Sequence, residues 1–173
     1  MAFAVTGAFK AIEHKADIVG IIILGHFPPH SISDPNYVII TTVTGIAIFF
    51  LYPKMQKHWN LFLKFDAIGL GVFTAIGATL AYQLFGMNFL AMAMAGMVTA
   101  VGGGILRDMF VNEIPMVFVK ELYASASFLG VVVFYILLLA NLQIEIVTVG
   151  SILVTTIIRL VAMKYNWNLP KVR

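Results

Sequence analysis

The residues best suited to chemistry form one pattern: three consecutive glycines in an apolar run, followed within one helical turn by Arg107 and Asp108. The glycine triplet consists of Gly102, Gly103 and Gly104. Each glycine lowers helix stability by about 1 kcal/mol relative to alanine, so the triplet predicts a break in a helix. Carbonyl groups freed at a break, with the hydroxyl of Thr99, can replace part of a cation's water shell, whereas Arg107 would raise a local barrier.

Two interpretations of this pattern differ in where the charges lie. In lipid, non-helical backbone is tolerated only where it is buried in protein or lines a water-filled cavity. Charge beside a broken helix is typical of an ion or substrate pathway. The alternative is a close-packing glycine face with Arg107 extending to the membrane surface. We favour the pathway, lined by Thr99, the glycine triplet, Arg107 and Asp108.

Two basic residues are weaker candidates. Ser151, Thr155 and Arg159 recur every four residues and predict one polar stripe on a helix. Because Arg159 lies five residues before Lys164, a surface anchor is favoured over a gate residue. Lys120 begins another predicted helix, where a cap and surface charge is favoured over a cytoplasmic vestibule. Lys120 and Arg159 are therefore secondary candidates for a vestibule or gate.

The remaining polar residues indicate structural roles. Asp17 and Asp66 precede apolar runs, where we expect N-caps that accept backbone amide protons rather than proton carriers. The four histidines share no ligand spacing with carboxylates, so no metal site is assigned. The sequence offers no nucleophile–base pair, so we expect no enzyme. We also expect no cofactor, only permeant K⁺ or Na⁺ and bound lipid.

Composition places these residues in a membrane. The chain is 61% hydrophobic and 11% charged, against about 25% charged in soluble domains. It has no cysteine, which excludes disulfides and thiolate metal sites. A net charge of +3 is too small to indicate nucleic-acid binding. The sequence predicts an all-α polytopic membrane protein.

Five apolar segments are long enough to span a bilayer. They are Asn36–Tyr52, Phe65–Phe85, Asn88–Val111, Leu122–Ala140 and Ile144–Met163. Met1–Ile12 and Ile18–Gly25 are too short for a hydrocarbon core of about 30 Å. Gly96, Ala100 and Gly104 place small residues at four-residue spacing, which favours packing within the subunit over oligomer contact.

An internal repeat accounts for the short N-terminal segments. Phe3–Ala8 matches Phe73–Ala78, and Gly25 matches Gly96, 71 residues later, whereas Pro29 matches Pro115, 86 residues later. The difference of 15 predicts residues missing after Gly25, and further ones before Met1; a natural half-helix is the alternative. We expect a single membrane domain over 1–173, with a first, incomplete repeat (1–52), a second repeat (65–140) and a seventh helix (144–163). Arg107 would pair with Asp108 or with a carboxylate of the first repeat.

Lysine and arginine predict the orientation of this domain. They gather in the loop around Lys57, beside Lys120 and in the tail after Lys164, whereas the intervening connections hold none. By the positive-inside rule the C-terminus is cytoplasmic and the N-terminus outside. Three helices per repeat then give inverted three-plus-three topology with a seventh helix appended.

Several motifs together resemble one family. Gly-Ala-Phe-Lys-Ala-Ile with a following Asp-Ile-Val-Gly, Thr-Ala-Val-Gly-Gly-Gly-Ile-Leu-Arg-Asp, Glu-Ile-Pro and Lys-Glu-Leu-Tyr-Ala are similar to prokaryotic trimeric intracellular cation (TRIC) channels. The resemblance implies seven transmembrane helices, a homotrimer in a prokaryotic plasma membrane, and a K⁺-permeable pore in each subunit. It also implies that the glycine triplet is the kink of the fifth helix. The triplet expected on the second helix has no counterpart here.

Two classes of function fit these features. The first is a monovalent cation channel. The second is a secondary transporter for a small solute such as glycine, because inverted repeats with broken helices are equally a transporter design. A membrane-embedded enzyme is the least favoured class.

Overall fold

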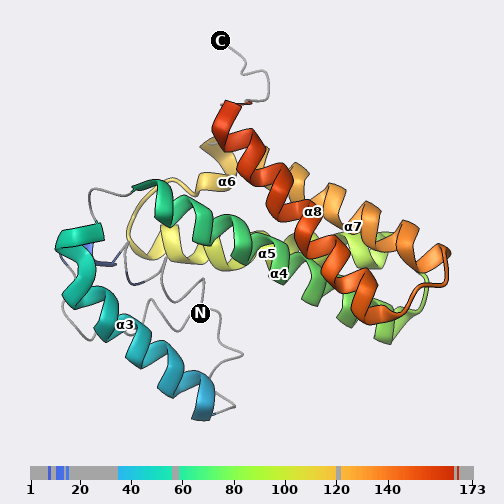
Figure 1. The fold of residues 1–173 in the computed structure, drawn as a ribbon, viewed down its shortest axis with the longest axis horizontal. Helices are drawn as coiled ribbons and strands as arrows, with labels where there is room; N and C mark the ends of the chain where they lie inside the picture. The colour runs from blue at the N-terminus through green and yellow to red at the C-terminus, as the bar shows by residue number, and fades with distance from the viewer. Residues whose placement is uncertain are drawn as a thin grey trace. The chain divides into compact units, whose positions relative to one another are not determined.

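The protein is helical wherever its structure shows regular secondary structure. This structure, a computed structural model, describes residues 8, 11–13, 15, 35–55, 59–119, 122–165 and 167. The helices are α3 (Pro35–Met55), α4 (Trp59–Phe85), α5 (Phe89–Phe110), α6 (Met116–Val119), α7 (Tyr123–Leu139) and α8 (Ile144–Tyr165) (Figure 1). The predicted all-α class is confirmed.

Three of these helices are long and apolar enough to cross a membrane. They are Leu63–Phe85, Phe89–Phe110 and Ile144–Tyr165, and shorter apolar helices run over Ile39–Phe50 and Tyr123–Leu139. Each falls on a segment that hydropathy predicts to span. The inverted arrangement of two repeats stays a prediction, and the proposed gap after Gly25 lies outside the described residues.

The chain divides into two compact units. Unit 1 comprises Met1–Asp66 and Gly103–Pro115, and unit 2 comprises Ala67–Gly102 and Met116–Arg173. The boundary therefore falls inside α4, after Asp66, and inside α5, within the glycine triplet. Each unit is considered separately below.

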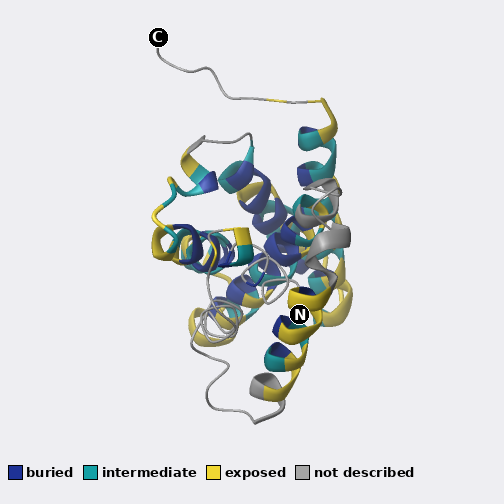
Figure 2. Ribbon diagram, turned by 90° about the vertical axis from the view of Figure 1, so that its left-hand side faces the viewer, coloured by how far each residue is buried: buried dark blue, intermediate teal, exposed yellow. Residues whose placement is uncertain are grey.

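Unit 2 holds an apolar core drawn from α4, α5, α7 and α8. One cluster contains Ala78, Ala81, Met92, Ala93, Val131, Phe134, Leu138 and Val147. A second contains Leu70, Ala100, Tyr123 and Ala126. Figure 2 shows buried and exposed residues on opposite sides of the helices. Alanine is frequent among the buried residues because a small side chain lets two helices approach closely.

Glycines mark the tightest contacts within unit 2. A Cβ atom on Gly96 would lie 2.7 Å from Val131 Cγ2, and one on Gly77 would lie 2.5 Å from the Ala95 carbonyl oxygen. A Cβ atom on Gly130 would overlap the Thr155 hydroxyl. Packing within the subunit, predicted for Gly96 and Ala100, is confirmed.

Helix α5 remains helical through the glycine triplet, from Phe89 to Phe110. The predicted break is therefore wrong as a loss of helical structure, because packing and the intrahelical hydrogen bonds outweigh the low propensity of three glycines. Asn88 caps the N-terminus, since its Oδ1 accepts a hydrogen bond from the Ala91 amide at 3.1 Å. Asn112, with φ of 58°, ends the helix, and the Glu113 amide donates to the Asp108 carbonyl at 2.9 Å.

Helix α4 begins at Trp59, six residues before the predicted start at Phe65. Asp66 consequently lies in the second turn and is not the predicted N-cap. The apolar residues after Trp59 continue the helix, so the backbone amides near Asp66 are already paired within it. Asp17, the other predicted cap, lies outside the described residues.

Candidate functional site

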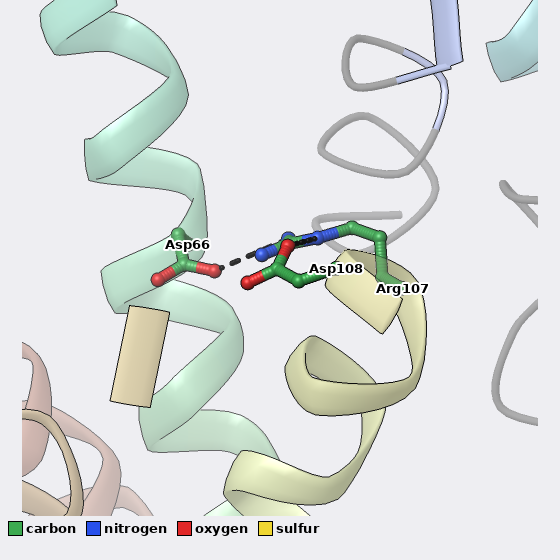
Figure 3. Close-up of polar contacts among 3 residues, drawn as sticks. All are labelled: Asp66, Arg107 and Asp108. Carbon is green, nitrogen blue, oxygen red and sulfur yellow. Dashed lines mark hydrogen bonds and ion pairs between the residues drawn. The ribbon is translucent and has the colours of Figure 1, made fainter. Parts of the chain in front are cut away.

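Three charged side chains are buried together in unit 1. Asp66 comes from α4, and Arg107 and Asp108 come from the last turn of α5; we call these three residues the charge cluster. Arg107 is 2% exposed, and Asp66 and Asp108 are each 1% exposed. Figure 3 shows both carboxylates turned toward the guanidinium group. Ionised residues are almost never fully buried unless they are paired.

The two carboxylates contact different nitrogens of Arg107. Arg107 Nε donates a hydrogen bond to Asp108 Oδ1 at 3.0 Å. Arg107 Nη1 donates to Asp66 Oδ1 at 3.4 Å. The guanidinium group keeps its proton in proteins, so with both carboxylates ionised the three side chains carry a net charge of −1.

This geometry tests the predicted partners of Arg107. The pair with Asp108 is confirmed, and the interpretation of Arg107 as a surface anchor is wrong, because its side chain is buried between two carboxylates. A carboxylate of the first repeat was the predicted alternative to Asp108, whereas the further carboxylate beside Arg107, Asp66, belongs to the predicted second repeat. Sequence analysis assigned Asp66 to a cap; an acidic residue within a candidate span was the signal that could have placed it beside Arg107.

The other residues of the predicted pathway lie along α5. Thr99 is half-buried, and its Oγ1 would lie 2.8 Å from a Cβ atom on Gly77. A Cβ atom on Gly102 would meet no heavy atom within 4 Å. Gly103 and Gly104 are buried. Thr99 and Gly102 belong to unit 2, and Gly103 and Gly104 to unit 1, so the structure groups only the last two with the charge cluster.

The polar stripe that the spacing predicts on α8 is buried, and the interpretation of Arg159 as a surface anchor is wrong. Ser151, Thr155 and Arg159 are each 0% exposed. The guanidinium carbon of Arg159 lies 4.8 Å from the centre of the Tyr123 ring, a cation–π contact that holds the charge inside unit 2. The sequence separation from Lys164 was a misleading guide, because the stripe faces α7. Lys120, the other secondary candidate, lies outside the described residues.

Buried hydroxyl groups in unit 2 form hydrogen bonds between helices. Sequence analysis named Ser151 and Thr155 among them but not Thr74 or Ser127. Thr74 Oγ1 lies 2.8 Å from Ser127 Oγ and also donates to the Leu70 carbonyl. Ser151 Oγ donates to the Gly130 carbonyl at 2.9 Å. Serine and threonine in apolar helices were the available signal. Among the described residues, no three or more His, Asp or Glu side chains gather as a metal site.

Apolar helices long enough to span a bilayer, with buried charged side chains on two of them, define a polytopic membrane protein with an internal polar site. A family model described as a glycine transporter matches residues 63–138. The inner membrane protein YadS of Escherichia coli K12, of the UPF0126 group, is 30% identical over 97% of this chain and 89% of its own length. The UPF0126 membrane protein YvgT of Bacillus subtilis is 32% identical, with 98% of this chain and 91% of its own length covered.

Solved structures are similar over nearly the whole chain. One, described in work on conductance through TRIC cation channels, has a TM-score of 0.89 and 32% identity, with 99% of this chain and 92% of that chain covered. The TRIC orthologue from Rhodobacter sphaeroides has a TM-score of 0.86 and 27% identity, with 95% and 92% covered. This chain belongs to the prokaryotic TRIC channel family, which the motifs around the glycine triplet predicted.

The relatives contain residues that this chain lacks. The alignment with YadS runs over 190 residues, and this chain has 173, so at least 17 aligned positions have no counterpart here. The alignment with YvgT runs over 187. The position of the gap, which the repeat places after Gly25, stays a prediction.

Proposed function

We propose that this protein is a monovalent cation channel, permeable to K⁺, with a pore in each subunit of a homotrimer. The observation that carries the proposal is the likeness, at a TM-score of 0.89 and 32% identity, to a structure described as a TRIC cation channel. A structure of similar likeness, 30% identical with a TM-score of 0.87, is described as a prokaryotic TRIC channel in 0.5 M KCl. The membrane location agrees with the bacterial inner membrane protein among its relatives.

The proposed ion path follows α5 from Thr99 past the glycine triplet to Arg107 and Asp108. Space beside Gly102 supports a path there, because a side chain at this position would occupy it. An intact helix can also bend at glycines without losing its hydrogen bonds. The charge cluster would supply the electrostatic element: a unit charge about 4 Å from an ion contributes about 4 kcal/mol at an effective dielectric constant of 20.

Single-channel recording tests this function most directly. Purified protein in planar bilayers with symmetric KCl should give unitary currents, whereas alternating access turns over too slowly to show them. The second candidate, a glycine transporter, is favoured by the description of the family model over residues 63–138. Uptake of labelled glycine into proteoliposomes, in the absence of unitary currents, would favour that alternative.

Gly103→Leu tests the path itself. Leucine adds bulk at a buried position and restores helix propensity by roughly 0.5–1 kcal/mol, so both effects favour a straight, closed helix. We expect a lower unitary conductance with an unchanged gel-filtration profile. Val98→Leu, which adds bulk at an exposed position of the same helix outside the proposed path, is the matched control and should keep most of the current. Wild-type conductance in Gly103→Leu would place the triplet outside the path.

The proposed orientation has the N-terminus outside and the C-terminus in the cytoplasm. The chain has no cysteine, so a single introduced thiol reports one position. Asn141 is exposed between α7 and α8, and Asn141→Cys in cells should react with an impermeant thiol reagent. Lys171→Cys should react only after the membrane is permeabilised. The reverse labelling pattern would invert the orientation.

A further inference from the structure

Helix capping does not account for the buried position of the Asp66 carboxylate. It lies within α4 rather than at a cap, it is 1% exposed, and its helix is long and apolar enough to span a membrane. A buried carboxylate is costly unless it is paired. Its described partner, Arg107, is 41 residues away and on α5. The pairing of Asp66 is therefore a property of the tertiary structure.

The two carboxylates constrain Arg107 differently. Asp108 is the next residue on the same helix and contacts Nε, close to the stem of the side chain. Asp66 contacts Nη1, at the outer end of the guanidinium group. Because Asp108 is on the same helix as Arg107, a movement of α5 would carry both residues together. Asp66 instead contacts the outer end of the guanidinium group from α4, and so links the end of α5 to α4.

Asp66 also changes the sign of the local charge. Arg107 and Asp108 alone sum to zero, and Asp66 adds one negative charge to the cluster. Inside a protein a unit charge acts over several ångströms with little screening. A neutral side chain at position 66 would leave the cluster one unit more positive and would remove the ion pair at Nη1.

We propose that Asp66 is a selectivity-determining residue of the channel. It holds the guanidinium group of Arg107 and gives the end of α5 the negative charge that favours cations over anions. This inference rests on the proposed cation-channel function. Asp66 acts partly through Arg107, so its role is to position that side chain as well as to attract the permeant ion.

The test is the reversal potential of purified channels in a KCl gradient. Wild-type protein and Asp66→Glu, which keeps the charge, should be cation-selective. Asp66→Asn, which has nearly the same shape, should lower the K⁺ to Cl⁻ permeability ratio by roughly tenfold. Glu145→Gln removes the same charge at an exposed position on α8 and is the matched control. It should leave the reversal potential unchanged.

A second variant separates charge from packing. Asp66→Asn combined with Arg107→Gln removes one charge of each sign, so the cluster keeps a net charge of −1, and it also removes the guanidinium group that loses an ion pair in Asp66→Asn alone. This double variant should retain cation selectivity even where Asp66→Asn alone does not assemble. Loss of selectivity in the double variant would overturn the proposal, because charge would then not be the cause.

The outcomes distinguish this inference from the proposed function. Wild-type unitary currents with a wild-type reversal potential in Asp66→Asn would overturn the role of Asp66 and leave the channel function intact. Absence of unitary currents in the wild-type protein would overturn both. A shift confined to Asp66→Asn, with Asp66→Glu and the double variant unaffected, is the result that the proposal requires.

Discussion

Two buried arginines are accommodated in different ways in the two units of this protein. In unit 1, Arg107 forms ion pairs with Asp66 and Asp108. In unit 2, Arg159 lies against the face of the Tyr123 ring, on a helix whose other buried polar groups, Ser151 and Thr155, are hydroxyls that donate to backbone carbonyls. Arg107 is thus surrounded by ionised groups, whereas Arg159 lies beside an aromatic ring on a helix with neutral hydroxyl groups.

The comparison separates two uses of polarity in a membrane protein. Neutral hydrogen bonds between helices contribute modestly to stability and suit a packing core. Ionised groups inside a membrane protein are costly and mark sites of function. We therefore expect substitutions in the charge cluster to change ion conduction, and substitutions where α7 packs on α8 to change stability first.

The largest effect is expected from Arg107→Ala. Removal of the guanidinium group leaves Asp66 and Asp108 as neighbouring buried carboxylates, and breaking a buried pair costs about 3–5 kcal/mol. The thermal unfolding midpoint of the purified oligomer should fall accordingly. Channels that do assemble should pass a larger unitary K⁺ current, since a positive charge beside the path is gone. Unchanged stability and current together would contradict the charge cluster.

Gly130→Val should have the next largest effect, confined to stability. A Cβ atom on Gly130 overlaps the Thr155 hydroxyl, so α7 and α8 must separate, and overpacking costs about 1–3 kcal/mol. Thermal unfolding measures the loss. Variant channels that remain assembled should keep wild-type ion selectivity. A shift in reversal potential here would show that the packing of α7 on α8 also controls permeation, and the contrast with the charge cluster would fail.

Tyr123→Leu tests how Arg159 is accommodated. The substitution removes the ring face beneath the guanidinium group, and a desolvated cation–π contact is worth about 1–2 kcal/mol. The unfolding midpoint should fall by less than in Arg107→Ala. Tyr123→Phe keeps the ring and is the matched control, with most of the stability retained. Equal losses in the leucine and phenylalanine variants would point to the hydroxyl rather than the ring.

The smallest effect is expected from Gly102→Ala. The position is open to an added methyl group and lies in an unbroken helix, where alanine is favoured over glycine by about 1 kcal/mol. The unfolding midpoint should stay the same or rise slightly. A clear fall would mean that the space beside Gly102 is needed for the fold itself, which would weaken its assignment to an ion path.

The sequence by itself determined the class, the spans and the family. Hydropathy is a sum over consecutive residues, so five apolar segments predicted membrane helices, and α3, α4, α5, α7 and α8 lie on them. The pair of Arg107 with Asp108 was also predictable, because adjacent residues stay close in any conformation. The motif around the glycine triplet identified the TRIC family, since it requires only the order of residues.

Tertiary structure alone decided which side chains meet across helices. The pairing of Asp66 with Arg107 joins α4 to α5, and no periodicity in one helix encodes the face of another. Burial of Arg159 depends on the side of α8 that packs on α7, which placed the Tyr123 ring beneath it. Helix α5 continues through three glycines because packing outweighs their low helix propensity. The sequence gives the propensity, but only the tertiary structure shows the packing.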